Sequence, residues 1–501
     1  MRCWMLVRTR SWTRGWFRVA LLALVTSVAA SCGGGAASTS RAGPRVLPGA
    51  TAHAVELELP VDDTEIVGSV TVRVRSLPGA RARDVLVRFE RTWLDRNGAL
   101  TRVPGAVVVP AFGLYASTMN EVEVDVGFVG GGAEAFALDV QTPPEAAGPL
   151  PWTVQHLDPD VALDFFFVQA QGPPCVVDVD GRVRWCAPPL DEPVFPFVAT
   201  ADGVLVGSMF TSALHRVDWA GRVAKGQLRD ARCRHTHHNL EPGKIGYLDT
   251  VTWRGDDYTR PQSVLVEVTP DGDIVHVWDF DRIVGQAIRD AGEAPAGLVR
   301  PGVDWFHMNS AVYDPSDDSI LASSRESFVI KVDYATGAIR WILGNPEKLW
   351  FSGYPKSLAP LALAVNGSPP IGQHALSVSP DGTRLLCFDN GRGNIVLENV
   401  GDDRLGSRVV EFTIDADART ATETWVYDLD PADSSGHCSS AMRTRAGDVL
   451  LVSSAPAAGG PARVFLVTDD GRVAFRAMPA EGTCDAAYHV LEAPWSDLVL
   501  E

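Results

Sequence analysis

Residues 330–343 read IKVDYATGAIRWIL, and this stretch decides the fold. An apolar segment enters a turn that contains glycine, and a second segment of the form x-Ile-x-Trp leaves it. This pattern predicts an antiparallel hairpin. Five further copies follow the same plan: VVDVDGRVRWC (176–186), HRVDWAGRVAK (215–225), VEVTPDGDIVHVW (266–278), VFLVTDDGRVAFR (464–476) and the degenerate VVEFTIDADARTATETWVY (409–427).

A second type of strand alternates with these hairpins. Two copies start near Phe195 and near Cys484, and four open with a histidine: THHNLEPGKIGYL (236–248), WFHMNSAVYDP (305–315), GQHALSVSPDG (372–382) and SGHCSSAMRTRAG (435–447). Six alternations of two strand types predict a six-bladed β-propeller. The chain would begin with a hairpin and end with a histidine-type strand. One blade would therefore combine both chain ends and close the ring without a free edge.

The region before the repeats has a different pattern. Residues 51–148 contain strand-like segments that alternate apolar and polar residues, which predicts one small β-sandwich. Residues 142–151 are rich in proline and alanine and are expected to be a linker. Residues 280–294 predict a short helix. The expected fold is all-β, with a β-sandwich domain over residues 51–148 and a six-bladed β-propeller over residues 152–501.

The N-terminus resembles an export signal rather than part of the fold. Five arginines precede an apolar segment, Val19 to Ala30, that is too short for a comfortable membrane span. Small residues directly before Cys32 indicate a bacterial lipoprotein, although Ala29 stands where leucine is commoner. We therefore expect a signal peptide over residues 1–31, lipidation at Cys32, a flexible tether over residues 32–50, and a periplasmic or cell-surface location. A plain secreted protein is the alternative.

Composition limits the classes of partner. The 501 residues are 46% hydrophobic, which suits a globular protein with a sizeable core. The formal net charge is −18, so a nucleic-acid partner is disfavoured, because phosphate binding needs a basic face. Contact with a membrane is expected only through the lipid anchor.

Export also implies an oxidising compartment. Cys175 and Cys186 stand symmetrically about the Asp180–Gly181 turn, so a hairpin would place them opposite each other as a disulfide. Cys438 and Cys484 form a weaker second candidate pair. The two remaining cysteines of the globular part, Cys233 and Cys387, are expected to be buried thiols.

Four histidines stand at the same position of the second strand type: His238, His307, His374 and His437. A propeller arranges equivalent strands around one axis, so equivalent positions converge although they are distant in sequence. A lone histidine in a strand is usually structural, but four at one position favour a shared site. We therefore expect at least three of these imidazoles to face one another.

The densest chemistry lies in residues 304–344. His307 and Asn309 share one face of a strand because side chains alternate. Arg325 lies 18 residues after His307. A hairpin between them would bring Arg325 back to the end of the sheet where the strand of His307 begins. Its planar fork of donors fits an oxyanion such as sulfate, phosphate or carboxylate. Taken alone, Arg325 would more often form a surface ion pair with Glu326 or Asp333.

Several of these segments resemble the bacterial arylsulfate sulfotransferase family. They are VPAFGLYASTMNEVEV (109–124), DWFHMNS (304–310) followed by SSR (323–325) and WILG (341–344), GQHALSVSPDGTRLLCFDNG (372–391) and LGSRVVEF (405–412). The resemblance covers most of the chain after residue 50. It implies an exported six-bladed propeller with an N-terminal β-sandwich that moves a sulfuryl group between phenols, without a nucleotide donor or other cofactor.

The resemblance also implies roles for individual residues. GQHA indicates His374 as the nucleophile that becomes transiently sulfated. DWFHMN and SSR indicate His307, Asn309 and Arg325 as ligands of the sulfuryl oxygens. THHN indicates His238 as a further active-site histidine, although the adjacent His237 is an equal match. His437 lies where the family has no expected histidine, and Trp305 is either a stacking platform for an aryl ring or a core residue.

Two other functions compete with this one. Several imidazoles around an axis can bind zinc or copper, although Arg325 would oppose a second cation and carboxylates are absent from the histidine positions. A non-catalytic propeller that binds an anionic ligand or a partner at the cell surface is the other alternative. For the enzyme, the expected partners are small phenolic sulfates and phenols. The sequence leaves open whether the chain forms a homodimer.

Overall fold

The computed structural model describes residues 43–145, 151–170, 172–393, 404, 406–484 and 486–501. The expected signal peptide and Cys32 lie outside these residues, so export and lipidation stay predictions. Among the described helices, none is long and apolar enough to cross a membrane. The helices are few and short: α1 (Arg91–Arg96), α2 (Phe280–Asp290), α3 (Leu349–Ser352) and the 3-10 turns η1 (Pro295–Gly297) and η2 (Ala359–Leu361). The protein is therefore all-β, and α2 is the helix predicted from residues 280–294.

Two sheets occupy the N-terminal part of the chain. One has the order β1 (Arg45–Pro48), β2 (Ala54–Pro60) and β5 (Ala106–Phe112). The other has the order β34 (Leu498–Leu500), β4 (Val85–Glu90), β3 (Val67–Val74), β6 (Met119–Phe128) and β7 (Ala133–Gln141). Alternate residues of both sheets, such as Leu57 and Val72, belong to one hydrophobic cluster. The apolar–polar alternation of the sequence therefore reports which side chains are buried.

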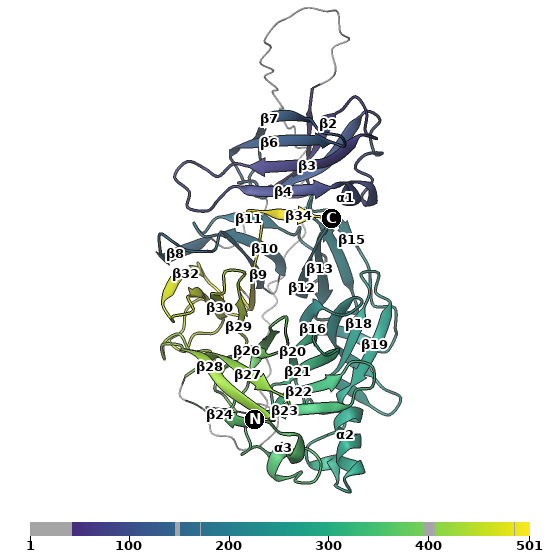
Figure 1. Ribbon diagram of the computed structural model, residues 1–501, viewed down its shortest axis with the longest axis vertical. Helices are drawn as coiled ribbons and strands as arrows, with labels where there is room; N and C mark the ends of the chain where they lie inside the picture. Colours follow the sequence, from purple (N-terminus) through teal and green to yellow (C-terminus); the bar gives the residue numbers. More distant parts are fainter. Residues whose placement is uncertain (1–42, 146–150, 171, 394–403, 405, 485) are drawn as a thin grey trace, which may run out of the picture. The chain divides into compact units, whose positions relative to one another are not determined.

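Two boundaries predicted from the sequence need correction. Residues 45–48, expected in the tether, form β1, which pairs with the edge of β2. Residues 498–500, expected in the propeller, form β34, which lies parallel to β4 (Figure 1). In both cases a short segment adds one more strand to the edge of a sheet, and its backbone pairs with the groups of the former edge strand.

The other six sheets lie between residues 152 and 492. The first two sheets have the strand orders β11 (Val183–Cys186), β10 (Gly172–Asp178), β9 (Phe165–Ala170), β33 (His489–Glu492), and β12 (Val194–Thr200), β13 (Gly203–Ser208), β14 (Leu214–Asp218), β15 (Val223–Ala224). The next two have the orders β16 (Cys233–Pro242), β17 (Tyr247–Arg254), β18 (Thr259–Val268), β19 (Ile274–Asp279), and β20 (Met308–Asp314), β21 (Ser319–Ser324), β22 (Phe328–Asp333), β23 (Ile339–Leu343). The last two have five strands each, in the orders β24 (Ala364–Asn366), β28 (Thr420–Asp428), β27 (Arg408–Asp415), β26 (Arg384–Asp389), β25 (His374–Val378), and β29 (Ser440–Arg443), β30 (Val449–Ser453), β31 (Arg463–Val467), β32 (Val473–Pro479), β8 (Trp152–Leu157).

The six predicted hairpins are all present, as β10–β11, β14–β15, β18–β19, β22–β23, β27–β28 and β31–β32. The second strand type forms one edge of each sheet, in strands β12, β16, β20, β25, β29 and β33. These edge strands contact one another in chain order. The rings of Phe195 and Tyr488, 4.7 Å apart, connect the last of them to the first. The edge strands thus surround a common axis, as in a β-propeller.

The first hairpin of the repeats and the last histidine-type strand share one sheet, as predicted. Strand β33 pairs with β9, so the last histidine-type strand completes the sheet that begins with the first hairpin. Side chains also join neighbouring inner strands by accepting backbone hydrogen bonds: Asn239 Oδ1 from Ala311 N at 2.9 Å, Ser310 Oγ from Leu376 N at 2.8 Å and Ser440 Oγ from Val490 N at 3.1 Å. These bonds fix the spacing of the strands that carry the histidines.

Both predicted disulfides are present. Cys175 bonds to Cys186 across the first hairpin, with an S–S distance of 2.06 Å, and Cys438 bonds to Cys484. Cys233 and Cys387 are buried thiols. The second disulfide joins the segment before β29 to the segment before β33, both of which lie close to the predicted site.

A buried arginine explains one of the quoted sequence segments. Arg184 Nε and Nη2 donate to Gly113 O at 2.9 and 2.6 Å, and Nη1 donates to Tyr115 Oη at 3.0 Å. Its guanidinium also lies 3.7 Å from the Tyr115 ring centroid and 3.3 Å from Asp178 Oδ2. The segment AFGLY therefore attaches the N-terminal sheets to the first hairpin.

Candidate functional site

The predicted histidines gather near the starts of the inner strands, but they do not share one register. His238 lies inside β16 and His374 begins β25, whereas His307 and His437 precede β20 and β29. The reason is a β-bulge in each of three inner strands, between His237 and Leu240, Met308 and Ser310, and His374 and Ser377. A bulge adds a residue and redirects side chains.

The bulges also place residues other than glycine in the left-handed region. The φ angle is 27° at His238 and 48° at both His307 and Ala375. Such angles are uncommon for residues with a Cβ and concentrate at functional sites. The repeated distortion turns side chains from three different sheets toward the axis.

His374 is held in one tautomer. Its Nδ1 lies 2.6 Å from Asn390 Oδ1 and 3.1 Å from Gly372 O. Both oxygens only accept hydrogen bonds, so Nδ1 carries the proton and Nε2 keeps its lone pair. The ring is 2% exposed. Burial, with the charges of Arg325 and His307, holds the pKa of His374 well below its usual 6.5. The imidazole is therefore neutral, with a nucleophilic nitrogen.

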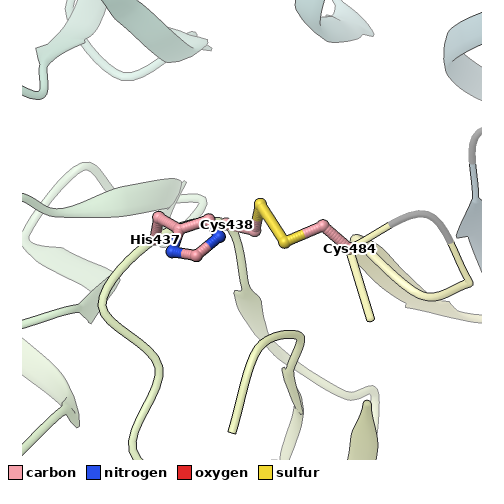
Figure 2. A group of neighbouring side chains, drawn as sticks. All are labelled: His437, Cys438 and Cys484. Carbon is pink, nitrogen blue, oxygen red and sulfur yellow. A yellow bond between two sulfur atoms is a disulfide. The ribbon is translucent and has the colours of Figure 1, made fainter. Parts of the chain in front are cut away.

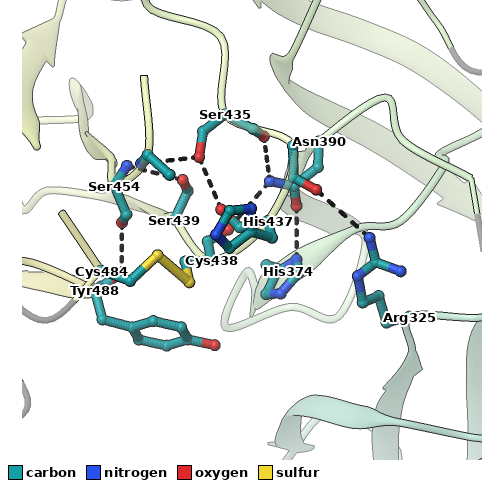
Figure 3. The surroundings of a disulfide bond; sticks show 12 residues. Arg325, His374, Asn390, Ser435, His437, Cys438, Ser439, Ser454, Cys484 and Tyr488 are labelled. Carbon is teal, nitrogen blue, oxygen red and sulfur yellow. Dashed lines mark hydrogen bonds between the residues drawn. A yellow bond between two sulfur atoms is a disulfide. The ribbon is translucent and has the colours of Figure 1, made fainter. Parts of the chain in front are cut away.

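Asn390, which sequence reasoning missed, fixes this tautomer. Its Nδ2 donates to Ser435 O at 2.6 Å and to Cys438 O at 3.2 Å, so its Oδ1 must face the ring of His374 (Figure 3). Cys438 belongs to the second disulfide, which therefore helps to hold the carbonyl that orients Asn390. His374 is paired with Phe388 across β25 and β26, so the hairpin itself brings Asn390 close.

Replacing Asn390 by alanine is expected to lower kcat about 100-fold, the usual cost of misplacing a reacting group by about 1 Å. KM should change little, because Asn390 acts through His374 rather than on the substrate. Steady-state kinetics with an aryl sulfate, the donor that the sequence resemblance implies, would measure both constants. Asn366→Ala, on the exposed edge strand β24, is the matched control. An unchanged kcat in the Asn390 variant would contradict this positioning role.

Gln373 links the two sheets that carry His374 and Arg325. Its carbonyl accepts from Asn309 Nδ2 at 2.8 Å and from Ser323 Oγ at 3.2 Å. Its Nε2 donates to Ser324 O at 2.9 Å. Hydrogen bonds of Gln373 therefore join the segments SSR, HMN and GQH. These bonds give a physical reason why the three segments occur together in the sequence. Asn309 uses one amide hydrogen in this contact and also borders the axial cavity.

Arg325 lies buried near His374 rather than on the surface. Its Nη1 is 3.1 Å from Glu326 Oε1 and 3.4 Å from Gly393 O. A Cβ on Gly372 would lie 3.8 Å from Arg325 Nη2, so the guanidinium adjoins the turn that precedes His374. Glycine is required there, because φ is 66° and a Cβ would lie 2.2 Å from the carbonyl of Arg392.

His307 has a carboxylate partner that the sequence did not suggest. Its Nδ1 lies 2.6 Å from Asp304 Oδ2, and its backbone N–H donates to Asp304 Oδ1 at 3.2 Å. The side chain is 20% exposed. A carboxylate on Nδ1 orients the ring and leaves Nε2 to exchange a proton with a ligand. Asp304 and His307 together have the geometry of a general acid and base.

The geometry distinguishes the two adjacent histidines. The His238 ring borders the axial cavity and lies 5.3 Å from the His307 ring, centroid to centroid. Burial, followed by the charges of its neighbours, holds the pKa of His238 well below 6.5. His237 points between the strands, where its Nε2 lies 2.7 Å from Thr252 Oγ1 and 3.0 Å from His235 Nδ1. His238 is therefore the histidine directed toward the site.

His437 lies at the exposed side of the cluster, beside the Cys438–Cys484 disulfide (Figure 2). Burial and the charges of Arg392 and Arg325 lower its pKa. Across the described ranges, His437 and these two sulfurs are the one group whose ligand atoms lie close enough to hold a metal ion. The two sulfurs are bonded to each other, so they do not offer two thiolates. The geometry gives the predicted metal alternative no support from the four histidines.

Trp305 does not fit the stacking role considered for it. It is fully buried in a hydrophobic cluster, and its ring N–H donates to Asp281 Oδ1 at 2.7 Å. Phe306 is likewise fully buried in the same cluster. Because neither ring has a free face, both are core residues that support the strand after His307.

A cavity of about 280 Å³ follows the axis from the histidines along the inner strands. His238, Asn309, Ala375 and Tyr488 border its end at the site. Farther along, most of its walls are apolar. The cavity therefore leaves room along the axis beyond His238 and Asn309, next to Ala375, which follows His374 in the chain.

Comparison with known proteins identifies the family of this chain. Residues 153–465 match the family model Arylsulfotransferase (ASST). The chain is 28% identical over 320 residues to "Arylsulfate sulfotransferase AssT" of Escherichia coli O6:H1, covering 50% of this chain and 52% of that protein. It is 26% identical over 317 residues to the protein of the same name from Lelliottia amnigena, with the same coverage. The chain thus spans about half the length of the curated relatives it matches.

Among solved structures, the β-propeller domain of Myceliophteria thermophila Cps50 (Swd1) is similar at a TM-score of 0.35 and 12% identity, covering 70% of this chain and 88% of that one. The family assignment does not depend on this likeness. The family match covers most of the chain, including every residue of the histidine cluster. The chain therefore belongs to the arylsulfotransferase (ASST) family.

Proposed function

We propose that this protein transfers a sulfuryl group from a phenolic sulfate ester to a phenol, through a sulfated His374 and without a nucleotide donor. The observation that carries the proposal is the fixed tautomer of His374. Its Nδ1 proton is held by Asn390 and Gly372, so a neutral Nε2 lone pair is available beside a buried guanidinium. Family membership and the printed names of the relatives support the same activity.

The first step forms a nitrogen–sulfur bond. The Nε2 lone pair of His374 attacks sulfur, the bond from sulfur to the aryl oxygen breaks, and its electron pair leaves with that oxygen. Protonated His307 gives its Nε2 proton to the departing phenolate, while Asp304 holds the other ring nitrogen. The product is a phenol and a sulfated His374 that still donates from Nδ1 to Asn390.

The second step reverses the first with another phenol. The oxygen of the incoming phenol attacks sulfur, the nitrogen–sulfur bond breaks, and its electron pair returns to His374. His307 accepts the phenolic proton and is ready for the next donor. In both steps Arg325 faces the sulfuryl oxygens, where a fixed cation stabilises the negative charge that shifts in the transition state.

Rapid-quench mass spectrometry would test the covalent step. The protein is mixed with a chromogenic aryl sulfate in the absence of acceptor, denatured within one turnover and digested. The peptide that contains His374 should carry one sulfuryl group, and addition of phenol before the quench should remove it. Release of inorganic sulfate without added phenol would indicate a hydrolase instead, and turnover with unmodified His374 would exclude the covalent route.

A further inference from the structure

The axial cavity contains a carboxylate that the proposed reaction does not use. Glu241 lies on β16, three residues after His238, and borders the cavity. Its neighbour Leu240 packs in the hydrophobic cluster of its own sheet. Because side chains alternate along a strand, Glu241 is turned the other way, toward the axis.

The surroundings of Glu241 are apolar. Around the cavity the other inner strands contribute Val312, Val378, Met442 and Leu491 beyond the polar residues next to the site. The cavity-lining hydroxyls of Ser310 and Ser440 accept hydrogen bonds from the next strand. The Glu241 carboxylate is the one acidic group among the described residues that line the cavity, in a wall where these apolar side chains stand beside Ser377 and Tyr313.

Glu241 also lacks a counter-ion among the residues that the structure describes. Glu241 is half-buried, and this desolvation raises its pKa to about 7, with no contribution from a neighbouring charge. His489 borders the same cavity, but burial lowers its pKa to about 4, so it is uncharged at neutral pH. An isolated carboxylate in such a place is unfavourable unless a cation joins it. A positively charged ligand would meet that need.

We propose that the axial cavity holds the aryl group of the substrate and that Glu241 binds an ammonium group carried by it. The preferred substrates would then be phenols with a cationic amine on a short chain opposite the hydroxyl. This inference rests on the proposed sulfotransfer at His374, because that reaction fixes where the phenolic oxygen lies.

Two geometrical arguments support this class of substrate. Glu241 lies farther along β16 than His238, which borders the cavity at the end near the site, so a phenol that enters from that end directs its opposite ring position toward Glu241. In a double displacement through one histidine, the leaving and the incoming aryl oxide occupy the same place, opposite the attacking nitrogen. One cavity therefore serves both the donor and the acceptor, and the amine preference should appear for each.

Paired acceptors would test the proposal. With the full chain, kcat/KM is measured for 4-hydroxyphenethylamine and for 4-ethylphenol, which has nearly the same shape without the charge. We expect the amine to be preferred at least about tenfold, the scale of one charge-assisted hydrogen bond. In Glu241→Gln the ratio should fall to about one. Glu347→Gln, at an exposed position, is the matched control and should keep the preference.

Calorimetric binding separates this inference from the proposed function. Phenethylammonium, which has no phenolic hydroxyl, should bind the wild-type protein but not Glu241→Gln, and phenethyl alcohol should not distinguish the two. Equal kcat/KM for both acceptors, with normal turnover, would overturn the ammonium site and leave sulfotransfer intact. Binding of phenethylammonium that depends on Glu241, without turnover of any phenol, would support the site and overturn the reaction.

Discussion

Replacing His374 by alanine is expected to reduce kcat for sulfuryl transfer by about 10⁴-fold or more, the scale on which a covalent nucleophile is lost. The substitution removes the one imidazole whose Nδ1 proton is fixed by Asn390 and Gly372. Neither neighbouring histidine would replace it. His307 is paired with Asp304, and His238 is held on another strand. Steady-state release of a chromogenic phenol would measure the loss.

The control for this variant is His156→Ala, because that histidine is 49% exposed on the outer strand β8. It should retain wild-type kinetics. Added imidazole should partly restore turnover of the His374 variant, since the truncated side chain leaves space for a free base next to Arg325. A His374 variant that turns over at the wild-type rate would assign the reaction to another residue.

The repeated hairpins could be predicted because their turns have a strict backbone requirement. Five of the six turns place glycine at a φ between 70° and 88°, at Gly181, Gly221, Gly272, Gly337 and Gly471. The degenerate copy has no glycine, and Arg419 adopts a φ of 55° in its turn instead. Turn chemistry is local, so it is visible in the sequence even where one copy departs from it.

The order of the histidines along the axis was less predictable. The sequence predicts a common register, but the bulges add one residue to β20 and to β25 and two to β16, at places that no short motif marks. The groups that position the histidines were missed for a different reason. Asp304 and Asn390 have common roles in turns and caps, and only the folded strands bring them to His307 and His374.

Sequence reasoning was also ambiguous where one residue type serves both the core and a site. Trp305 precedes His307 by two residues, so regular alternation would place both side chains on one face, yet Trp305 points into the core and hydrogen bonds to Asp281. Successive side chains on a strand face opposite sides, and the bulge near His307 obscures which side each one takes. Arg325 shows the opposite case, because it forms the ion pair with Glu326 that a surface arginine would form, but does so while buried beside the site.

Removing the charge of Arg325 should have the second largest effect. Loss of one preorganised donor to a developing anion typically lowers kcat by about 10² to 10³-fold. Arg325→Gln alone would remove a cation that lies 3.1 Å from the buried carboxylate of Glu326. The double variant Arg325→Gln, Glu326→Gln removes both charges together and is therefore the better test, with Glu326→Gln as its control. The double variant should lose activity while the control retains most of it.

The pH profile separates catalysis from a merely structural role. The charge of Arg325 is one cause of the depressed pKa of His374, so its removal should raise that pKa. His374 must be neutral to attack sulfur. The acidic limb of kcat against pH, where His374 becomes protonated, should therefore move to higher pH in the double variant and stay in place in the Glu326 control. A parallel fall in kcat at every pH, with an unmoved limb, would mean that Arg325 does not act on the nucleophile.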